Sequence, residues 1–285
     1  MTGLPRTAVT GATGAVGGAV ARQLAEQGLP LRLLVRTPSK APDLAGAVVQ
    51  GCSYGDRAAA ERALQGVEVL FMVSASESAD RRQQHRTFVD AAAAAGVRQI
   101  VYTSFVGATA DAVFTLVRDH AATEQHIMAS GMAFTFLRDN LYQDVMEPFA
   151  GEDRVIRGPA DDGRVGMVAR ADVARVAATV LRSPDEHAGV TYTLTGPEAL
   201  TLAEVAEILT AFRGQPFRFH NETLAEAYAS RQQYGAPDWQ VEAWVSTYTA
   251  IAAGQLDVVT DHVERVSGRR PMSLAEHLAA NSAHS

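Results

Sequence analysis

Short apolar runs alternate with helical patterns through the first half of this 285-residue chain. The runs are almost continuously apolar, which is typical of strands that helices cover on both faces. They comprise residues 7–10, 31–35, 47–49, 68–73, 99–104 and 133–137. Helices, each followed by a glycine that can cap the last turn, are expected over residues 15–27, 57–65, 80–95 and 119–130. The alternation predicts an α/β fold with a doubly wound parallel sheet.

After the sixth apolar run, polar and turn-rich sequence leads into mostly helical segments. A helix is expected over residues 172–182 and a strand over residues 191–196. We therefore expect residues 1–150 to form a nucleotide-binding domain and residues 151–285 to form a smaller, mostly α-helical lobe. Segments at about residues 172–200 are expected to return to the first domain.

Three segments of the second half, beginning at Thr201, Thr223 and Ser273, share the order hydroxyl, Leu, Ala, Glu. A hydroxyl residue followed three positions later by Glu is the pattern of a capping box at the start of a helix. The segments look like a repeat, but three independent helix starts are the simpler interpretation and the one we expect.

A glycine-rich turn joins the first strand to the first helix. Gly11, Gly14 and Gly17 lie three positions apart, whereas the common dinucleotide pattern spaces its first two glycines by two. A strand-to-helix turn points backbone N–H groups and the helix dipole at an anion. The context therefore indicates dinucleotide binding. The turn comprises Gly11, Ala12, Thr13, Gly14, Ala15, Val16 and Gly17.

The end of the second strand bears on which dinucleotide is bound. An acidic residue there would bind the ribose 2′-hydroxyl of NAD, but Arg36 stands in that position, followed by Thr37, Ser39 and Lys40. A guanidinium with neighbouring hydroxyls suits a 2′-phosphate, so NADP(H) is the expected cofactor. An ordinary solvated arginine is the alternative.

Composition limits the remaining classes of function. The net charge is −7, which leaves no basic surface for nucleic acid. Cys52 is the only cysteine, so no internal disulfide forms, and a small semi-buried side chain is expected rather than a reactive thiol. Neither a signal peptide nor a run of about 18 apolar residues is present, so no membrane partner is expected. We expect a cytoplasmic protein without a metal site.

Longer segments resemble a known family. They are VTGATGAVG, LVR, VSASESADRRQQHRTFVDAAAAAGVRQIVYTS, HAATEQHIMASGMAFTFLRDNLYQD and VTDHVERVSGRRPMSLAEHL. Together they resemble the NmrA-like branch of the atypical short-chain dehydrogenases/reductases, in particular bacterial NADPH:quinone reductases and triphenylmethane reductases. The resemblance covers nearly the whole chain and implies a Rossmann domain with a small, mostly α-helical C-terminal lobe.

The resemblance also implies further site residues. Those of the cofactor are Ser53, Tyr54, Ser74, Ala75, Ser76, Thr103, Ser104, Phe105, Asn140 and Leu141, and Phe105 and Tyr142 would line the substrate pocket. Core packing is an equal alternative for Phe105 and Leu141. The chain departs from the family at Ser53, where many relatives have Asp against the adenine, and at Gln125, where relatives often have Lys.

A stripe of Trp239, Trp244 and Tyr248 follows helical spacing. Core packing is the main expectation for such a stripe. The alternative is that Trp239 and Trp244 wall a pocket for a flat aromatic acceptor.

The usual Tyr-Lys pair of short-chain dehydrogenases has no counterpart here, because Lys40 is the only lysine and follows Arg36 by four positions. The expected region of the pair runs from His120 to Glu124, and we expect these two side chains to pair across one helical turn. His120 and Tyr142 are the candidates for an acid or base, and neither is assigned a role.

Two functions from different classes fit these observations. The first is an NADPH-dependent reductase, monomeric or homodimeric, that transfers hydride directly to a quinone-like or other conjugated small molecule. The second is a regulator that senses NADP(H) and binds a protein partner without turnover. The resemblance to the reductase branch favours the first, and direct DNA binding is disfavoured by the acidic balance.

Overall fold

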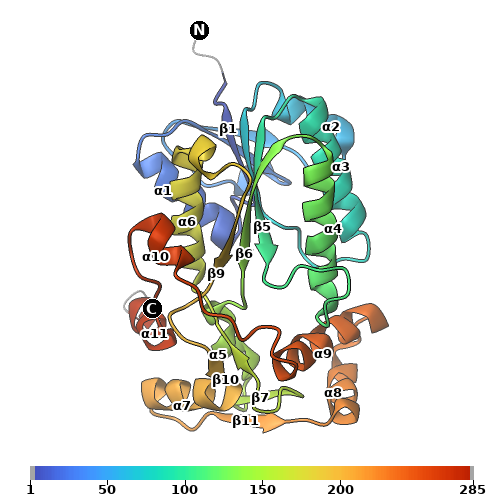
Figure 1. Ribbon diagram of the computed structural model, residues 1–285, viewed down its shortest axis with the longest axis vertical. Coiled ribbons are helices and arrows are strands. Elements are labelled where there is room, and N and C mark those ends of the chain that lie inside the picture. Colours follow the sequence, from blue (N-terminus) through green and yellow to red (C-terminus); the bar gives the residue numbers. More distant parts are fainter. Residues whose placement is uncertain (1–3, 283–285) are drawn as a thin grey trace. The chain divides into compact units, whose positions relative to one another are not determined.

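The computed structural model describes residues 4–282. Seven strands form one sheet in the order β3-β2-β1-β4-β5-β6-β9 (Figure 1). The strands are β1 (Thr7–Thr10), β2 (Leu31–Val35), β3 (Ala47–Gly51), β4 (Val69–Met72), β5 (Gln99–Phe105), β6 (Ala133–Asp139) and β9 (Val190–Leu194).

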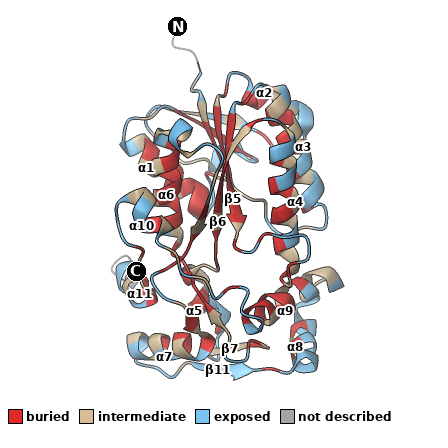
Figure 2. Ribbon diagram, in the orientation of Figure 1, coloured by how far each residue is buried: buried red, intermediate tan, exposed pale blue. Residues whose placement is uncertain are grey.

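The register of β1 shows how the sheet is built. β1 runs parallel to β2 and to β4, so that Val9 lies opposite Leu33 on one side and Phe71 on the other. β2 and β3, and likewise β4 and β5, are also parallel. Every residue of β2 and β4 is buried, as the nearly continuous apolar runs predicted. Figure 2 shows the same burial along β5. The doubly wound parallel sheet is confirmed.

Helices cover both faces of this sheet. In Figure 1, α1 and α6 lie along one side of the strands, and α2, α3 and α4 lie along the other. Their bounds are α1 (Ala15–Glu26), α2 (Arg57–Leu64), α3 (Arg81–Ala94), α4 (Thr115–Ala129) and α6 (Arg170–Arg182). α4 begins earlier than predicted, at Thr115, whose backbone N–H donates to the Ser246 hydroxyl at 3.1 Å. That partner lies 131 residues away, so the local pattern gave no sign of it.

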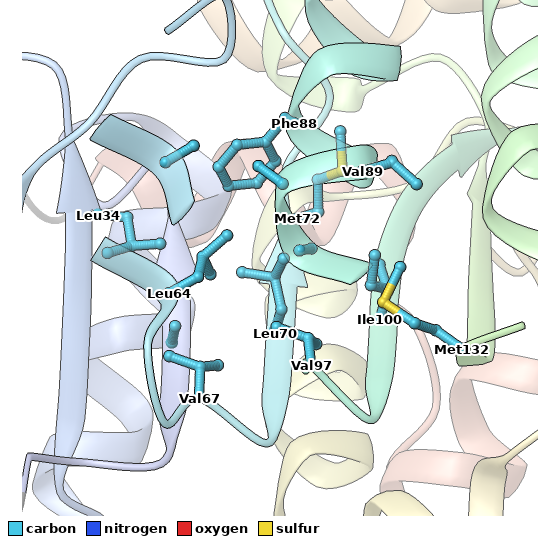
Figure 3. Packing of buried hydrophobic residues seen from close by; sticks show 14 of the residues in the cluster. Leu34, Leu64, Val67, Leu70, Met72, Phe88, Val89, Val97, Ile100 and Met132 are labelled. Atoms are coloured by element: carbon cyan, nitrogen blue, oxygen red, sulfur yellow. The ribbon is translucent and has the colours of Figure 1, made fainter. Parts of the chain in front are cut away.

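An apolar core packs between the sheet and helices α2 and α3 (Figure 3). Leu70 and Ile100 of the strands lie in this core with Leu64 of α2 and Phe88 of α3, and all four side chains are fully buried. Each such side chain contributes about 1.5–3 kcal/mol by leaving water. This packing fixes the strand ends that carry the candidate site.

The chain divides into two compact units. The first comprises residues 1–104, 119–138 and 173–192, and the second comprises residues 105–118, 139–172 and 193–285. The boundaries predicted from sequence, with a break near residue 150, stay a prediction.

The second unit is mostly helical, as expected for the C-terminal part. Its remaining helices are α5 (Met146–Phe149), α7 (Leu202–Arg213), α8 (Leu224–Arg231), α9 (Asp238–Ala252), α10 (His262–Ser267) and α11 (Leu274–Ser282). Two small sheets join them: β7 (Val155–Gly158) runs parallel to β11 (Arg218–Asn221), and β8 (Arg164–Val165) runs antiparallel to β10 (Leu200–Thr201). Short 3₁₀ helices cover Pro38–Lys40, Gln143–Val145, Pro184–His187 and Gln232–Tyr234.

The three capping boxes are confirmed as helix starts. Thr201 and Thr223 each accept from the backbone N–H of the Glu three positions on, and that Glu accepts in return from the threonine N–H. Ser273 and Glu276 make the same reciprocal bonds at the start of α11. The shared sequence therefore reflects a shared local need for N–H acceptors, because the first turn of a helix has none of its own.

Within residues 4–282, no helix is both long enough and apolar enough to cross a membrane.

Candidate functional site

The glycine turn after β1 has the conformation that its sequence predicts. Gly11 has a φ of +64°, which is the left-handed region that side chains disfavour. A Cβ atom on Gly11 would lie 3.1 Å from the Cβ atom of Val73. The Gly14 N–H donates to the Gly11 carbonyl at 2.8 Å and closes the turn.

Gly17 lets α1 lie directly on this turn. A Cβ atom on Gly17 would stand 2.4 Å from the Gly11 carbonyl oxygen and 2.5 Å from the Thr10 carbonyl oxygen. Both atoms belong to the backbone, so no side-chain rotation would relieve the overlap. Only glycine fits this position without moving the helix.

The first turn of α1 is open to an anion. Gly14 is the N-cap residue and supplies no side-chain bond, and the first turn holds no acidic residue. Thr13, Gly14 and Ala15 are exposed there. Helix N–H groups without a cap, at the positive end of the helix dipole, suit a phosphate or pyrophosphate. The residues present therefore fit the diphosphate of a dinucleotide.

Arg36 lies directly after β2, the strand beside β1 in the sheet. Its side chain is exposed, as are those of Thr37, Ser39 and Lys40. Because β1 and β2 are parallel, Arg36 and the glycine turn follow the same edge of the sheet. This placement allows a 2′-phosphate contact, which stays a prediction.

Tyr54 has a structural role that the sequence did not suggest. Its hydroxyl donates to the Val73 carbonyl at 2.6 Å and lies 2.6 Å from the Thr10 hydroxyl. These two contacts connect the ends of β1 and β4 through Tyr54. Its ring stacks on Phe88 with centroids 4.2 Å apart. Burial raises the pKa of Tyr54, so the phenol stays protonated. The neighbouring Ser53 is half-buried.

Cys52 is buried, in line with the expectation of a small packing side chain rather than a reactive thiol. Burial, followed by the nearby charge of Asp56, raises the pKa of its thiol to about 12. A thiol that stays protonated at neutral pH is a poor nucleophile.

The segment after β4 meets the end of β5 through its backbone. The Ser74 N–H donates to the Thr103 hydroxyl at 2.8 Å. Thr103 is 2% exposed, whereas Ser76 is exposed and Ala75 is half-buried. The structure thus brings Ser74, Ala75 and Thr103 together at one edge of the sheet.

The expected pairing of His120 with Glu124 is wrong. Glu124 instead accepts from the Ser104 hydroxyl at 2.6 Å and from Nε and Nη2 of Arg138 at 2.9 and 2.6 Å. Both Ser104 and Glu124 are buried. Tertiary partners from β5 and β6 outcompete the helical neighbour, because they satisfy both oxygens of a buried carboxylate.

His120 is held by buried partners on other elements. Arg81 donates from Nη2 to Nε2 of His120 at 2.9 Å, and the Tyr102 hydroxyl lies 3.1 Å from Nδ1. Burial, followed by the charge of Arg81, lowers the pKa of His120 well below its usual value. These contacts leave His120 neutral and count against a role as a proton donor.

Tyr142 is bonded to a buried carboxyl group. Its hydroxyl donates to Asp139, the last residue of β6, and the Arg170 guanidinium lies 4.8 Å from the centre of its ring. Burial raises the pKa of Asp139 to about 7, and burial and the Asp139 charge raise the pKa of Tyr142 well above 10. Sequence reasoning missed Asp139, although an acidic residue that ends a buried strand was a usable signal.

Asn140 and Leu141 have packing contacts within the second unit. The Asn140 side chain is fully buried, donates to the Leu256 carbonyl at 3.0 Å and accepts from the Leu141 N–H at 2.8 Å. Leu141 and Phe105 pack against an apolar cluster of that unit, in line with the core-packing alternative. Phe105 also meets Phe114 edge to face, with centroids 5.5 Å apart.

The aromatic stripe of α9 divides into two parts. Tyr248 is buried in the core cluster, where Arg231 lies over its ring at 5.2 Å. Trp239 and Trp244 are half-buried, and Trp244 meets Tyr234 edge to face at 5.9 Å. Core packing is thus confirmed for Tyr248, and a pocket role for the two tryptophans stays a prediction.

Within residues 4–282, no group of three or more His, Cys, Asp or Glu side chains is placed to hold a metal ion.

A doubly wound sheet whose glycine turn opens onto an uncapped helix N-terminus defines a dinucleotide-binding protein of the Rossmann class. Residues 11–184 match the NAD(P)H-binding family, and the chain belongs to that family. NAD(P)H is therefore its cofactor. The predicted NmrA-like relationship and the assignment as an oxidoreductase are confirmed by the relatives below.

The chain is 35% identical to quinone oxidoreductase 2 of Escherichia coli, over 95% of this chain and 97% of that protein. The crystal structure of the E. coli NADPH-dependent quinone oxidoreductase with NADPH matches with a TM-score of 0.88 and 34% identity, over 97% of this chain and 99% of that one. Triphenylmethane reductase of Citrobacter sp., solved with NADP(H), matches with a TM-score of 0.85 and 30% identity, over 96% and 99% of the two chains.

A negative transcriptional regulator, Nmra, shares the fold with a TM-score of 0.76 at 15% identity, over 99% of this chain and 98% of that one. Similarity at this level extends to the fold alone.

Proposed function

We propose that this protein is an NADPH-dependent reductase that transfers hydride directly to a quinone-like or other conjugated acceptor. The observation that carries the proposal concerns the segment where a Tyr-Lys pair would lie. There Glu124 is hydrogen-bonded to Ser104 and Arg138, and His120 is hydrogen-bonded to Arg81. No group there is free to exchange a proton with an alcohol. The quinone and dye reductases among the relatives support this class of acceptor.

The chain's own residues would hold the cofactor along one edge of the sheet. The turn from Gly11 to Gly17 would bind the pyrophosphate, and Arg36, with Thr37 and Lys40, would bind the 2′-phosphate. Further contacts are proposed for Ser53, Ser74, Ala75, Ser76, Thr103, Ser104, Phe105, Asn140 and Leu141. When bound, the nicotinamide supplies the hydride.

Tyr142 is the proposed proton donor to the reduced acceptor. Its raised pKa keeps the phenol protonated, and Asp139, with a pKa of about 7, can return a proton to it. A quinone needs such a proton after hydride arrives, because the product is an anion. A cationic dye needs none, since hydride neutralises it.

The acceptor pocket is proposed to include Phe105, Tyr142, Trp239 and Trp244, whose rings suit a flat conjugated molecule. A monomer or homodimer in the cytoplasm is proposed as the working form.

NADPH consumption across a panel of quinones and cationic dyes tests the proposal. Turnover above background with at least one member is expected, with NADPH preferred over NADH. Binding of NADPH without turnover of any member would contradict the reductase and favour a sensing role. Failure to bind either cofactor would exclude both.

A further inference from the structure

Two buried side chains of α3 hold the backbone of Ala75, in the segment after β4. The Ala75 N–H donates to Nε2 of His85 at 2.9 Å, and Nε of Arg81 donates to the Ala75 carbonyl at 2.9 Å. His85 is fully buried and Arg81 is 4% exposed. Polar groups of surface loops usually find water as their partner. Here both backbone polar groups of Ala75, which belong to two successive peptide groups, are bonded to buried side chains, which restricts where this residue can lie.

A chain of hydrogen bonds behind His85 sets its tautomer. The Thr123 hydroxyl donates its single proton to the Asp119 carbonyl at 2.7 Å, so its oxygen accepts from Nδ1 of His85 at 2.8 Å. With the proton on Nδ1, Nε2 carries the lone pair that the Ala75 N–H needs. Burial and the charge of Arg81 lower the pKa of His85 to about 3, so the ring stays neutral.

Ala75 lies where a dinucleotide would pass. Ala75 follows β4, which is the direct neighbour of β1 and its glycine turn in the sheet. In doubly wound sheets, ligands bind outside the carboxyl ends of the strands where the strand order reverses, and β1 and β4 form that point here. The Ser74 N–H, bonded to Thr103, fixes the preceding peptide as well.

We propose that His85 and Arg81 are positioning residues for NADP(H), which act by keeping residues 74–76 in one conformation before the cofactor arrives. The proposal rests on the proposed function, because it needs NADP(H) at this edge of the sheet. A preformed loop avoids the cost of ordering on binding, so losing it weakens affinity. Neither side chain takes part in hydride transfer, so kcat is expected to change little.

Three variants test the role of His85. His85→Leu removes the acceptor of the Ala75 N–H, and His85→Gln offers an amide oxygen in its place. Thr135→Val is the matched control: Thr135 is fully buried on β6, and its hydroxyl donates to the His187 carbonyl at 2.8 Å. The dissociation constant for NADPH is followed by cofactor fluorescence, the melting temperature by calorimetry, and exchange of the Ala75 amide proton by NMR.

His85→Leu is expected to raise the NADPH dissociation constant about tenfold and to speed Ala75 exchange, whereas His85→Gln stays within about twofold of wild type. Thr135→Val is expected to lower the melting temperature without changing affinity. Equal NADPH affinity in wild type and His85→Leu would overturn this inference alone. No NADPH binding by wild type would overturn the proposed function, and this inference with it.

Thr123→Val tests the same role of His85 if His85→Leu does not fold. It removes the acceptor of Nδ1–H and with it the preference for the tautomer that serves Ala75. Faster Ala75 exchange together with weaker NADPH binding is expected. Unchanged affinity in a folded Thr123→Val protein with fast Ala75 exchange would overturn the proposal.

Discussion

The Tyr142 hydroxyl donates its hydrogen bond to Asp139, a carboxyl group that is 4% exposed and has its pKa raised to about 7 by burial. The ordinary Asp value is 3.8, so the folded protein keeps a proton that the unfolded chain releases between these two values. The contribution of Asp139 to stability is therefore present below pH of about 4 and is lost as the pH rises to about 7.

Asp139→Asn is expected to remove this loss. A shift of about three pKa units corresponds to about 4 kcal/mol, so the variant should gain about this much stability relative to wild type as the pH rises from about 4 to about 8. Urea unfolding at both pH values measures the difference. Asp111→Asn, at an exposed position, is the control and should change the free energy of unfolding by the same amount at both pH values. A parallel pH dependence in wild type and Asp139→Asn would contradict the assignment.

Tyr142→Phe is expected to separate two kinds of acceptor. Quinone reduction needs a proton on the product oxygen and should slow about tenfold or more, because a positioned acid is lost. Reduction of a cationic dye needs no proton and should keep its rate. Steady-state kcat for both acceptors in the same preparation gives the comparison. Equal slowing of the two would point to a packing role for the ring.

Arg36→Ala is expected to weaken NADPH binding about tenfold while NADH binding stays the same, because only NADPH carries the 2′-phosphate. Fluorescence titration with each cofactor measures both constants. Arg86→Ala, another exposed arginine, should change neither. Equal affinities of Arg36→Ala and wild type for NADPH would favour the alternative that Arg36 is an ordinary solvated arginine.

Gly17→Ala is expected to destabilise the fold by about 3 kcal/mol and to abolish measurable NADPH binding, since the added Cβ overlaps two backbone carbonyls. Gly28→Ala is the control: its φ is +78°, but a Cβ there meets nothing within 4 Å, so only about 1 kcal/mol of backbone strain is added. Denaturant unfolding and cofactor titration follow the two effects. Normal cofactor affinity in Gly17→Ala would show that the turn tolerates displacement.

Arg231→Met tests a buried ion pair of the second unit. Arg231 donates to Glu222 at 2.7 Å and to the Arg157 carbonyl at 3.0 Å, and both charged side chains are nearly fully buried. Removing the arginine leaves Glu222 uncompensated, at an expected cost of about 3–5 kcal/mol. The double variant with Glu222→Gln should recover part of this loss in thermal unfolding. No recovery would mean that the carbonyl contact, rather than the pair, stabilises the unit.

Several features of the fold followed from short stretches of sequence. The apolar runs predicted β1 to β6 to within a few residues, because burial on both faces imposes a nearly unbroken apolar pattern. The capping boxes at Thr201, Thr223 and Ser273 were readable because each uses only four consecutive residues. Gly11 was also predictable, since a tight turn between strand and helix demands its left-handed conformation.

The partners of the buried polar groups were decided by the tertiary structure. Glu124 lies four residues from His120, yet it bonds to Ser104 and Arg138, and His120 bonds to Arg81. Likewise, only the fold shows that Tyr54 joins two strand ends and that His85 holds the Ala75 peptide.

By itself, the sequence determined the doubly wound sheet and its glycine turn, because strand burial, turn conformation and helix capping act between near neighbours in the chain. The hydrogen-bond partners of the buried charges were left to the tertiary structure. Those partners are distant in sequence, and each buried polar group takes whichever partner best offsets its lost hydration.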